Sequence, residues 1–172
     1  MSFSLIPRQL CRSIYHLDLD RLYARGVRVL FADLDNTLAR YGEQGPSPQL
    51  RSWAAEVEGR GIRLFVLSNS RKATRADRFC TELGIPYLKH AGKPKKGGFQ
   101  RAMAINGVTP DQCAIVGDQI FTDILGARRS GVLALLVEPV ELAGNPGRYI
   151  RYAVETPFRA LGRRRGGVRG GV

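Results

Sequence analysis

Two carboxylates separated by one residue are the first sign of chemistry in this chain of 172 residues. Asp33 and Asp35 lie in the stretch Asp-Leu-Asp-Asn-Thr-Leu, directly after an apolar run. A carboxylate in such a place can attack a phosphorus atom, and a neighbouring one can protonate the leaving oxygen and then activate water. We therefore expect Asp33 to act as nucleophile and Asp35 as acid and base, although an acidic pair alone is also common at surface turns.

Two further elements contain groups that bind phosphate. Ser68 and Asn69 follow an apolar run, and a hydroxyl, an amide and backbone N–H groups that lead into a helix form a phosphate cradle. Lys93 precedes a proline and two glycines, and its ammonium can offset charge on phosphoryl oxygens in a transition state. The alternatives are a plain N-cap at Ser70 and a solvated basic loop, in which Lys96 competes with Lys93 as the phosphate ligand.

A fourth element, Gly-Asp-Gln-Ile-Phe-Thr-Asp, has the pattern of a hard-cation site. Asp118 follows an apolar run and Asp123 lies five residues later. Mg²⁺ prefers oxygen ligands and keeps several waters, so we expect Asp118 to bind it directly. We expect Asp123 to orient Asp118 or a water, and the alternative is a favourable acid in the first turn of a helix.

The elements that must position these residues alternate between strand and helix. Apolar, β-rich runs predict strands at Val27–Ala32, Ile62–Leu67, Ile85–Leu88, Ala114–Gly117 and Val132–Val137. Capping signals and glycines predict helices over Pro48–Arg60, Arg71–Leu83, Gly98–Ile105 and Ile120–Ser130. Such repeats predict a parallel sheet with helices on both faces. Asp33, Ser68 and Asp118 then follow strands at the carboxyl edge of the sheet, where ligands bind in open α/β folds.

The order of the four elements is more specific than any one of them, because they recur at roughly 25 to 35 residues, about one strand–helix unit. Over about Val27 to Val137 the chain resembles the haloacid-dehalogenase superfamily of phosphohydrolases, subclass III. The resemblance implies a Rossmann-like three-layer α/β sandwich. It also implies Mg²⁺ held by the Asp33 carboxylate, the Asp35 carbonyl and Asp118. The other residues carried over are Ser68 and Lys93 on the phosphoryl group and the supporting Thr37 and Asp123.

A narrower resemblance includes the N-terminal region. Leu-Ile-Pro from Leu5 and Ser-Ile-Tyr from Ser13 precede the acidic motif, as in the YqeG-like branch, which is similar to phosphatidylglycerophosphate phosphatases of mitochondria and plastids. This resemblance implies a lipid headgroup as substrate. A phosphatase of a soluble sugar phosphate or nucleotide is the first alternative. An RNA- or ribosome-associated binding protein with a vestigial site is the second.

The short intervals between the motifs leave no room for a large cap domain. We therefore expect an open site, which suits a large substrate. The organisation we predict is a helical lead-in over residues 1–26, a phosphatase core over 27–157 and a basic, disordered tail over 158–172.

The charge balance favours anionic partners. Lysine and arginine number 27 and acids 15, so the net charge is +12, and arginines concentrate towards both ends. Phosphate esters, anionic lipid headgroups and nucleic acid all fit such a surface, and a solvated tail is the alternative. Tyr149, Ile150, Tyr152 and Phe158 could line a basic amphipathic helix that lies on a membrane, or they could equally pack on the sheet. Pro157 is expected to interrupt such a helix.

Cysteine usage bears on the compartment. The three cysteines lie far apart without a CxxC pair, no apolar run approaches the roughly 20 residues of a membrane span, and Met1 to Arg12 lacks a signal-peptide pattern. We expect a cytoplasmic protein, peripheral to the inner face of the membrane.

Overall fold

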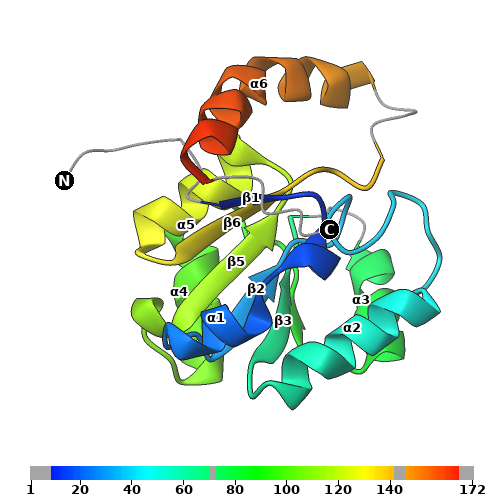
Figure 1. The fold of residues 1–172 in the computed structure, drawn as a ribbon. Coiled ribbons are helices and arrows are strands. Elements are labelled where there is room, and N and C mark those ends of the chain that lie inside the picture. Colours follow the sequence, from blue (N-terminus) through cyan, green and yellow to red (C-terminus); the bar gives the residue numbers. More distant parts are fainter. Residues whose placement is uncertain (1–8, 70–72, 142–145, 167–172) are drawn as a thin grey trace.

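A parallel six-stranded sheet forms the centre of the protein (Figure 1). The structure is a computed structural model, and it describes residues 9–69, 73–141 and 146–166. The strands are β1 (Gln9–Cys11), β2 (Val29–Ala32), β3 (Arg63–Leu67), β4 (Tyr87–Leu88), β5 (Cys113–Gly117) and β6 (Leu133–Val137). Their order is β1-β6-β5-β2-β3-β4, and each neighbouring pair is parallel. The predicted parallel α/β architecture is confirmed.

Helices cover both faces of this sheet. They are α1 (Leu19–Ala24), α2 (Pro48–Gly59), α3 (Ala73–Leu83), α4 (Lys96–Asn106), α5 (Leu125–Ser130) and α6 (Pro146–Gly166), with short turns η1 (Ile14–His16), η2 (Pro110–Gln112) and η3 (Ile120–Ile124). Apolar residues of α1, α2 and α3 share one hydrophobic cluster, whereas those of α4, η3 and α5 share a second one. Helix α6 packs beside β1 (Figure 1). The result is the three-layer sandwich that the strand–helix repeat predicts.

The central strand β2 shows why the sheet forms. All four of its residues are buried, as expected for a strand covered on both faces. Leu30 faces the first cluster and Phe31 the second. The ring of Phe31 meets Phe65 of β3 and Phe99 of α4 edge-on, with centroids 5.9 and 6.3 Å apart. This packing fixes the position of β2 between the two helical layers, and hence the position of the residues that follow it.

Local signals set several helix ends as the sequence predicts. Ser47 accepts a hydrogen bond from the Leu50 N–H at 3.1 Å, so it caps α2 ahead of Pro48. Gly107 and Gly131 follow α4 and α5 in the left-handed conformation that ends a helix. The N-cap expected at Ser70 lies outside the described residues.

The N-terminal lead-in contains a strand as well as helical turns, which is a correction to the helical prediction for residues 1–26. β1 pairs with β6, and Leu10 stands opposite Leu136. β1 has only three residues, Gln9–Cys11, and so short a segment shows no periodicity from which a strand could be predicted. Their extended conformation comes from hydrogen bonding to an edge that lies more than 120 residues away in the chain.

The C-terminal helix runs across the boundary that the sequence suggested at residue 157. Helix α6 is continuous through Pro157 to Gly166, so residues 158–166 are helical and Pro157 does not interrupt the helix. Phe158 meets Phe121 edge-on at 6.2 Å between ring centroids, and Arg159 is buried. These contacts on the C-terminal side of Pro157 offset the missing backbone hydrogen bond. Residues 167–172 of the expected tail lie outside the described part.

The described chain carries no large cap. Between Asp33 and Ser68 the only regular helix is α2, and between Ser68 and Lys93 it is α3. Within the described residues, no helix combines the length and the apolar character needed to cross a membrane.

Adjacent glycines at the start of α4 allow a test of the packing that supports the Lys93 loop. A methyl group on Gly98 would overlap the backbone carbonyl of Ala91, whereas one on Gly97 would meet nothing within 4 Å. We expect Gly98→Ala to lower the free energy of unfolding by about 1–3 kcal/mol through overpacking. The matched Gly97→Ala variant should be neutral or stabilising by up to about 1 kcal/mol. Urea unfolding measures both, and equal effects would contradict the packing.

Candidate active site

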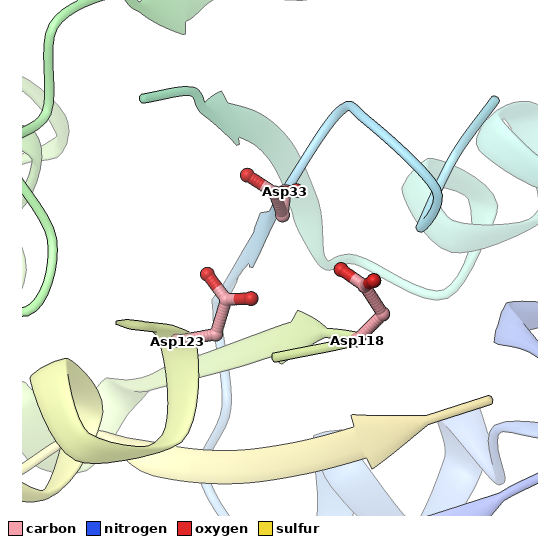
Figure 2. Close-up of side chains that lie close together, drawn as sticks. All are labelled: Asp33, Asp118 and Asp123. Atoms are coloured by element: carbon pink, nitrogen blue, oxygen red, sulfur yellow. The ribbon is translucent and has the colours of Figure 1, made fainter. Parts of the chain in front are cut away.

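Polar residues from neighbouring strands meet at the carboxyl edge of the sheet. Asp33, Ser68 and Asp118 directly follow β2, β3 and β5, and all three are buried. Because β2 lies between β5 and β3, their ends are adjacent in space. Figure 2 shows the carboxylates of Asp33 and Asp118 near that of Asp123, which comes from η3. The structure thus brings together the residues that the motifs singled out.

Three carboxylates crowd this position. Asp33, Asp118 and Asp123 each offer an oxygen, and these oxygens all lie within 4.8 Å of one another. Their exposed fractions are 7%, 6% and 1%. Like charges at such a separation, away from water, are costly unless a cation neutralises them. The donor set consists of oxygen alone, which suits a hard divalent cation such as Mg²⁺.

The ammonium of Lys93 meets two of the three acids. Its Nζ lies 2.6 Å from Asp33 Oδ1 and 2.6 Å from Asp123 Oδ1, and its side chain is buried. Burial by itself would lower the pKa of Lys93, but the charges of Asp123 and Asp33 outweigh it and hold the pKa above its usual range. Ionised, the described cluster has two negative charges in excess.

Burial has the opposite effect on Asp123. It raises the pKa of this carboxyl to about 6, with Lys93 opposing the rise and Asp33 adding to it. Asp123 Oδ2 also accepts a hydrogen bond from the Gln119 N–H at 3.2 Å. The carboxylate is packed so closely over Gly117 that a Cβ there would overlap it. Asp123 thus stands in the first turn of η3, as one alternative predicted, and contacts Lys93 directly.

The lysine at the site is Lys93 and not Lys96, which begins α4 and is exposed. Asn69 fixes the Lys93 backbone on both sides. Its Oδ1 accepts from the Lys93 N–H at 2.9 Å, and its Nδ2 donates to the Lys93 carbonyl at 2.8 Å. The Ser68 carbonyl accepts from the Ala91 N–H at 3.0 Å and joins the same two loops. Asn69 therefore positions Lys93, and its direct contact with phosphate stays a prediction.

The turn after β2 arranges the rest of the first motif. Asn36 has a positive φ of 65°, and its N–H donates to the Ala39 carbonyl at 2.7 Å, which closes the turn. Thr37 Oγ1 then donates to Asp118 Oδ1 at 3.2 Å and links the motifs that follow β2 and β5. The supporting role of Thr37 in the reaction stays a prediction.

Asp35 has a partner that the sequence did not indicate. Its carboxylate forms a hydrogen-bonded ion pair with Arg75 of α3, and Arg75 also donates to the Arg40 carbonyl at 2.6 Å. Arg75 is one of 27 lysines and arginines, and it lies 40 residues from Asp35 in the chain. No local pattern distinguishes it, so only the packing of α3 could reveal the contact.

A groove opens beside the site. Its volume is about 730 Å³, and Thr37 lies on its wall. Other residues that line it are Arg12, Tyr15, Arg40, Tyr41 and Val140. Asp33, Asp118 and Lys93 are not among the residues that line it, so Thr37 is where the groove adjoins the acidic cluster.

Comparisons with known proteins agree with this geometry. The family model described as haloacid dehalogenase-like hydrolase matches residues 5–131. The chain is 33% identical over 156 residues to the probable phosphatase YqeG of Bacillus subtilis (strain 168), covering 91% of this chain and 89% of that protein. It is 34% identical over 149 residues to the chloroplastic phosphatidylglycerophosphate phosphatase 1 of Chlamydomonas reinhardtii, covering 82% of this chain and 55% of that relative.

The fold also has solved counterparts. A 3-deoxy-D-manno-octulosonate 8-phosphate phosphatase from Moraxella catarrhalis, crystallised with magnesium ion, phosphate ion and KDO, superposes with a TM-score of 0.53. The two chains are 16% identical, and the match covers 86% of this chain and 95% of the other. At this identity the likeness bears on the fold alone.

Proposed function

Because the chain belongs to the haloacid dehalogenase-like hydrolase family and is a phosphatase, we propose that it hydrolyses phosphomonoesters through a phosphoenzyme on Asp33, with Mg²⁺ as cofactor. One observation carries the proposal. The buried Lys93 ammonium holds Asp33 and Asp123 at 2.6 Å each, with Asp118 in the same cluster. A nucleophilic carboxylate beside a fixed cation is the arrangement that phosphoryl transfer requires.

The proposed reaction has two halves. A carboxylate oxygen of Asp33 attacks phosphorus while the bond to the leaving oxygen breaks, and Asp35 donates a proton to that oxygen. Asp35 then takes a proton from water, whose oxygen attacks phosphorus and breaks the bond to Asp33. Inorganic phosphate leaves and Asp33 is restored. Arg75 fixes the orientation of the Asp35 carboxylate, and Lys93 and Ser68 bind the phosphoryl oxygens.

Mg²⁺ fits this donor set. The Asp33 and Asp118 carboxylates and the Asp35 backbone carbonyl would hold it, and the carboxylate of Asp123 lies within the same cluster. When bound, the ion neutralises charge on the phosphoryl oxygens and on the crowded carboxylates. Thr37 orients Asp118 through its hydrogen bond of 3.2 Å.

We propose phosphatidylglycerophosphate as the substrate. Two kinds of observation support it. A relative at 34% identity bears that activity in its name. Among the described residues no large cap covers the site. A groove of about 730 Å³ next to Thr37 would accommodate the remainder of a large headgroup.

We further propose that the basic ends, and α6 in particular, bring the enzyme onto anionic lipid. Ile150, Val154 and Leu161 lie on one side of α6, with exposed fractions of 68%, 55% and 44%. The same helix carries basic residues, namely the exposed Arg151 and the run Arg163–Arg165 in its sequence. An apolar stripe combined with basic residues is typical of helices that lie at a membrane interface. Peripheral contact with the inner face of the membrane is compatible with the cytoplasmic location that we predict.

Of the four residues for which the sequence left both packing and membrane contact open, Tyr152 and Phe158 face inwards. The hydroxyl of Tyr152 donates to Glu138 Oε2 at 2.9 Å, and Phe158 packs on Phe121. Tyr149 and Ile150 are exposed as the amphipathic pattern predicts. The apolar stripe is therefore narrower than the sequence suggested.

Substitution of the nucleophile tests the mechanism. We expect Asp33→Asn to reduce kcat by at least about 10³-fold, because an amide forms no acyl phosphate and is a poor metal ligand. The change is nearly isosteric, so the thermal unfolding midpoint should remain close to wild type. Asp111→Asn, an exposed acid outside the site, is the control. Mg²⁺-dependent turnover by Asp33→Asn within tenfold of wild type would contradict the mechanism.

Metal removal tests the cofactor. EDTA should abolish hydrolysis and Mg²⁺ should restore it, whereas Ca²⁺ should not, because it is larger and accepts more ligands. Mg²⁺ at 100 times its dissociation constant should also add about 2.7 kcal/mol to the free energy of unfolding. Asp118→Asn should remove most of that gain. Full activity in EDTA would rule out the metal role.

The surface proposal predicts a separation between lipid and soluble substrates. Val154→Ser combined with Leu161→Ser should weaken binding to phosphatidylglycerol vesicles about tenfold, since loss of buried apolar area costs on the order of 1.4 kcal/mol. Turnover of vesicle-borne phosphatidylglycerophosphate should fall with it. Hydrolysis of a small soluble phosphate ester should stay unchanged.

The control for this experiment is Ile105→Ser, which removes an apolar side chain that is 63% exposed on α4. Added salt should reproduce part of the loss for the wild type. Wild-type vesicle binding by the double variant would contradict the role of α6. Rapid turnover of a sugar phosphate or nucleotide with none of the lipid would favour the soluble-substrate alternative, and tight binding to RNA alone would favour the RNA-binding alternative.

A further inference from the structure

The inner side of α6 carries two buried charges that the proposed reaction does not use. Glu155 and Arg159 have exposed fractions of 1% and 2% and lie one helical turn apart. Arg159 NH2 is 3.2 Å from Glu155 Oε2, so they form an ion pair. Both side chains point at the segment that follows β5, which contains Asp118.

Glu155 holds the backbone just beyond Asp118. Its Oε1 accepts from the Ile120 N–H at 2.9 Å and from the Phe121 N–H at 3.2 Å. These are the first N–H groups of η3, which have no partner within that turn. The carboxylate thus anchors the start of η3, and with it Asp123.

Arg159 holds the same segment from the other side. Its guanidinium donates to the backbone carbonyl of Asp118. It also reaches Glu138 Oε2 at 3.2 Å and lies over the ring of Tyr152, 4.6 Å from its centroid. Asp118 is therefore held at its carbonyl by Arg159 and at its carboxylate by Thr37 Oγ1, 3.2 Å away.

Stability alone does not account for this pair. A buried ion pair is often no better for stability than apolar residues of equal volume, because desolvation offsets the attraction. Arg159 Nε is in addition buried without a hydrogen-bond partner among the described residues, which is a further cost. What the pair does provide is a fixed position for the backbone on both sides of Gln119.

We propose that Arg159 and Glu155 are positioning residues that hold the Asp118 carboxylate in place for the metal ion. The inference rests on the proposed function, because it requires Mg²⁺ at Asp118. Groups that orient metal ligands typically change metal affinity or activity by about 10–100-fold when they are removed. In this proposal, helix α6 acts on the metal site through the backbone of Asp118 and Ile120.

The test compares Mg²⁺ binding in the full chain. Arg159→Met keeps the apolar stem and removes every side-chain donor. The matched control is Arg151→Met, at an exposed position of the same helix whose guanidinium donates to Gln119 Oε1 at 2.6 Å and not to the Asp118 carbonyl. Isothermal titration and Mg²⁺-dependent thermal shift give the dissociation constant. We expect about a tenfold or greater weakening for Arg159→Met and less than a twofold change for the control.

A purely structural role would give a different result. It would lower the unfolding midpoint in EDTA and leave the Mg²⁺ dissociation constant unchanged, and that outcome overturns the proposal. Arg159→Lys retains the buried charge and covers the case in which Arg159→Met does not fold. A single ammonium cannot replace the planar fork at Asp118, Glu138 and Glu155 together, so this variant should bind Mg²⁺ at least several-fold more weakly.

Failure of the proposed function is separable from failure of this inference. If wild-type protein gives no Mg²⁺-dependent shift, the metal site itself is absent and the inference falls with it. If wild type binds Mg²⁺ through Asp118 while folded Arg159→Lys binds it equally well, the metal site stands and only the positioning role is wrong.

Discussion

The ion pairs of the buried Lys93 are the interaction on which the rest of the site depends. Three carboxylates within 4.8 Å of one another would repel each other strongly in a site with so little water, and Lys93 lies 2.6 Å from two of them. The lysine must therefore be held firmly. Asn69 fixes its backbone, and the close approach of Gly98 to Ala91 packs α4 against the loop that contains it.

The parallel sheet causes this crowding of carboxylates, and it also gathers the candidate catalytic residues in one place. Strand β2 lies between β3 and β5, so the loops that follow these strands meet at one edge. The central strands of a parallel sheet bury nearly all of their side chains, because helices cover both faces. Chemistry is therefore concentrated where Asp33, Ser68 and Asp118 emerge. The divalent cation that we propose would balance the negative charge that Lys93 leaves in excess.

Helix α6 extends this logic from the core to the surface. Its inner side contacts the Asp118 segment through Glu155 and Arg159, and its outer side presents Ile150 and Val154 to solvent. One helix therefore lies between the proposed metal site and the surface that we propose for lipid contact. In the proposal made above, this outer surface of α6 selects a substrate carried on anionic lipid, in a protein whose described residues form no large cap.

The sequence by itself determined the parts of this protein that depend on local patterns. Apolar runs, caps and terminating glycines located the central strands and most helices. The motif spacing identified Asp33, Ser68, Lys93 and Asp118 as neighbours, because parallel strand ends must share an edge.

Only the tertiary structure decided the long-range partners. Strand β1 pairs with the edge of β6, and α6 continues past residue 157, where Phe158 packs against Phe121 of η3. The ion pair of Asp35 with Arg75 and the hold of Arg159 on Asp118 join residues 40 and 41 positions apart. The chain has 27 lysines and arginines, and no local pattern marks Arg75 or Arg159 among them. Their partners follow from the way in which whole helices pack on the sheet.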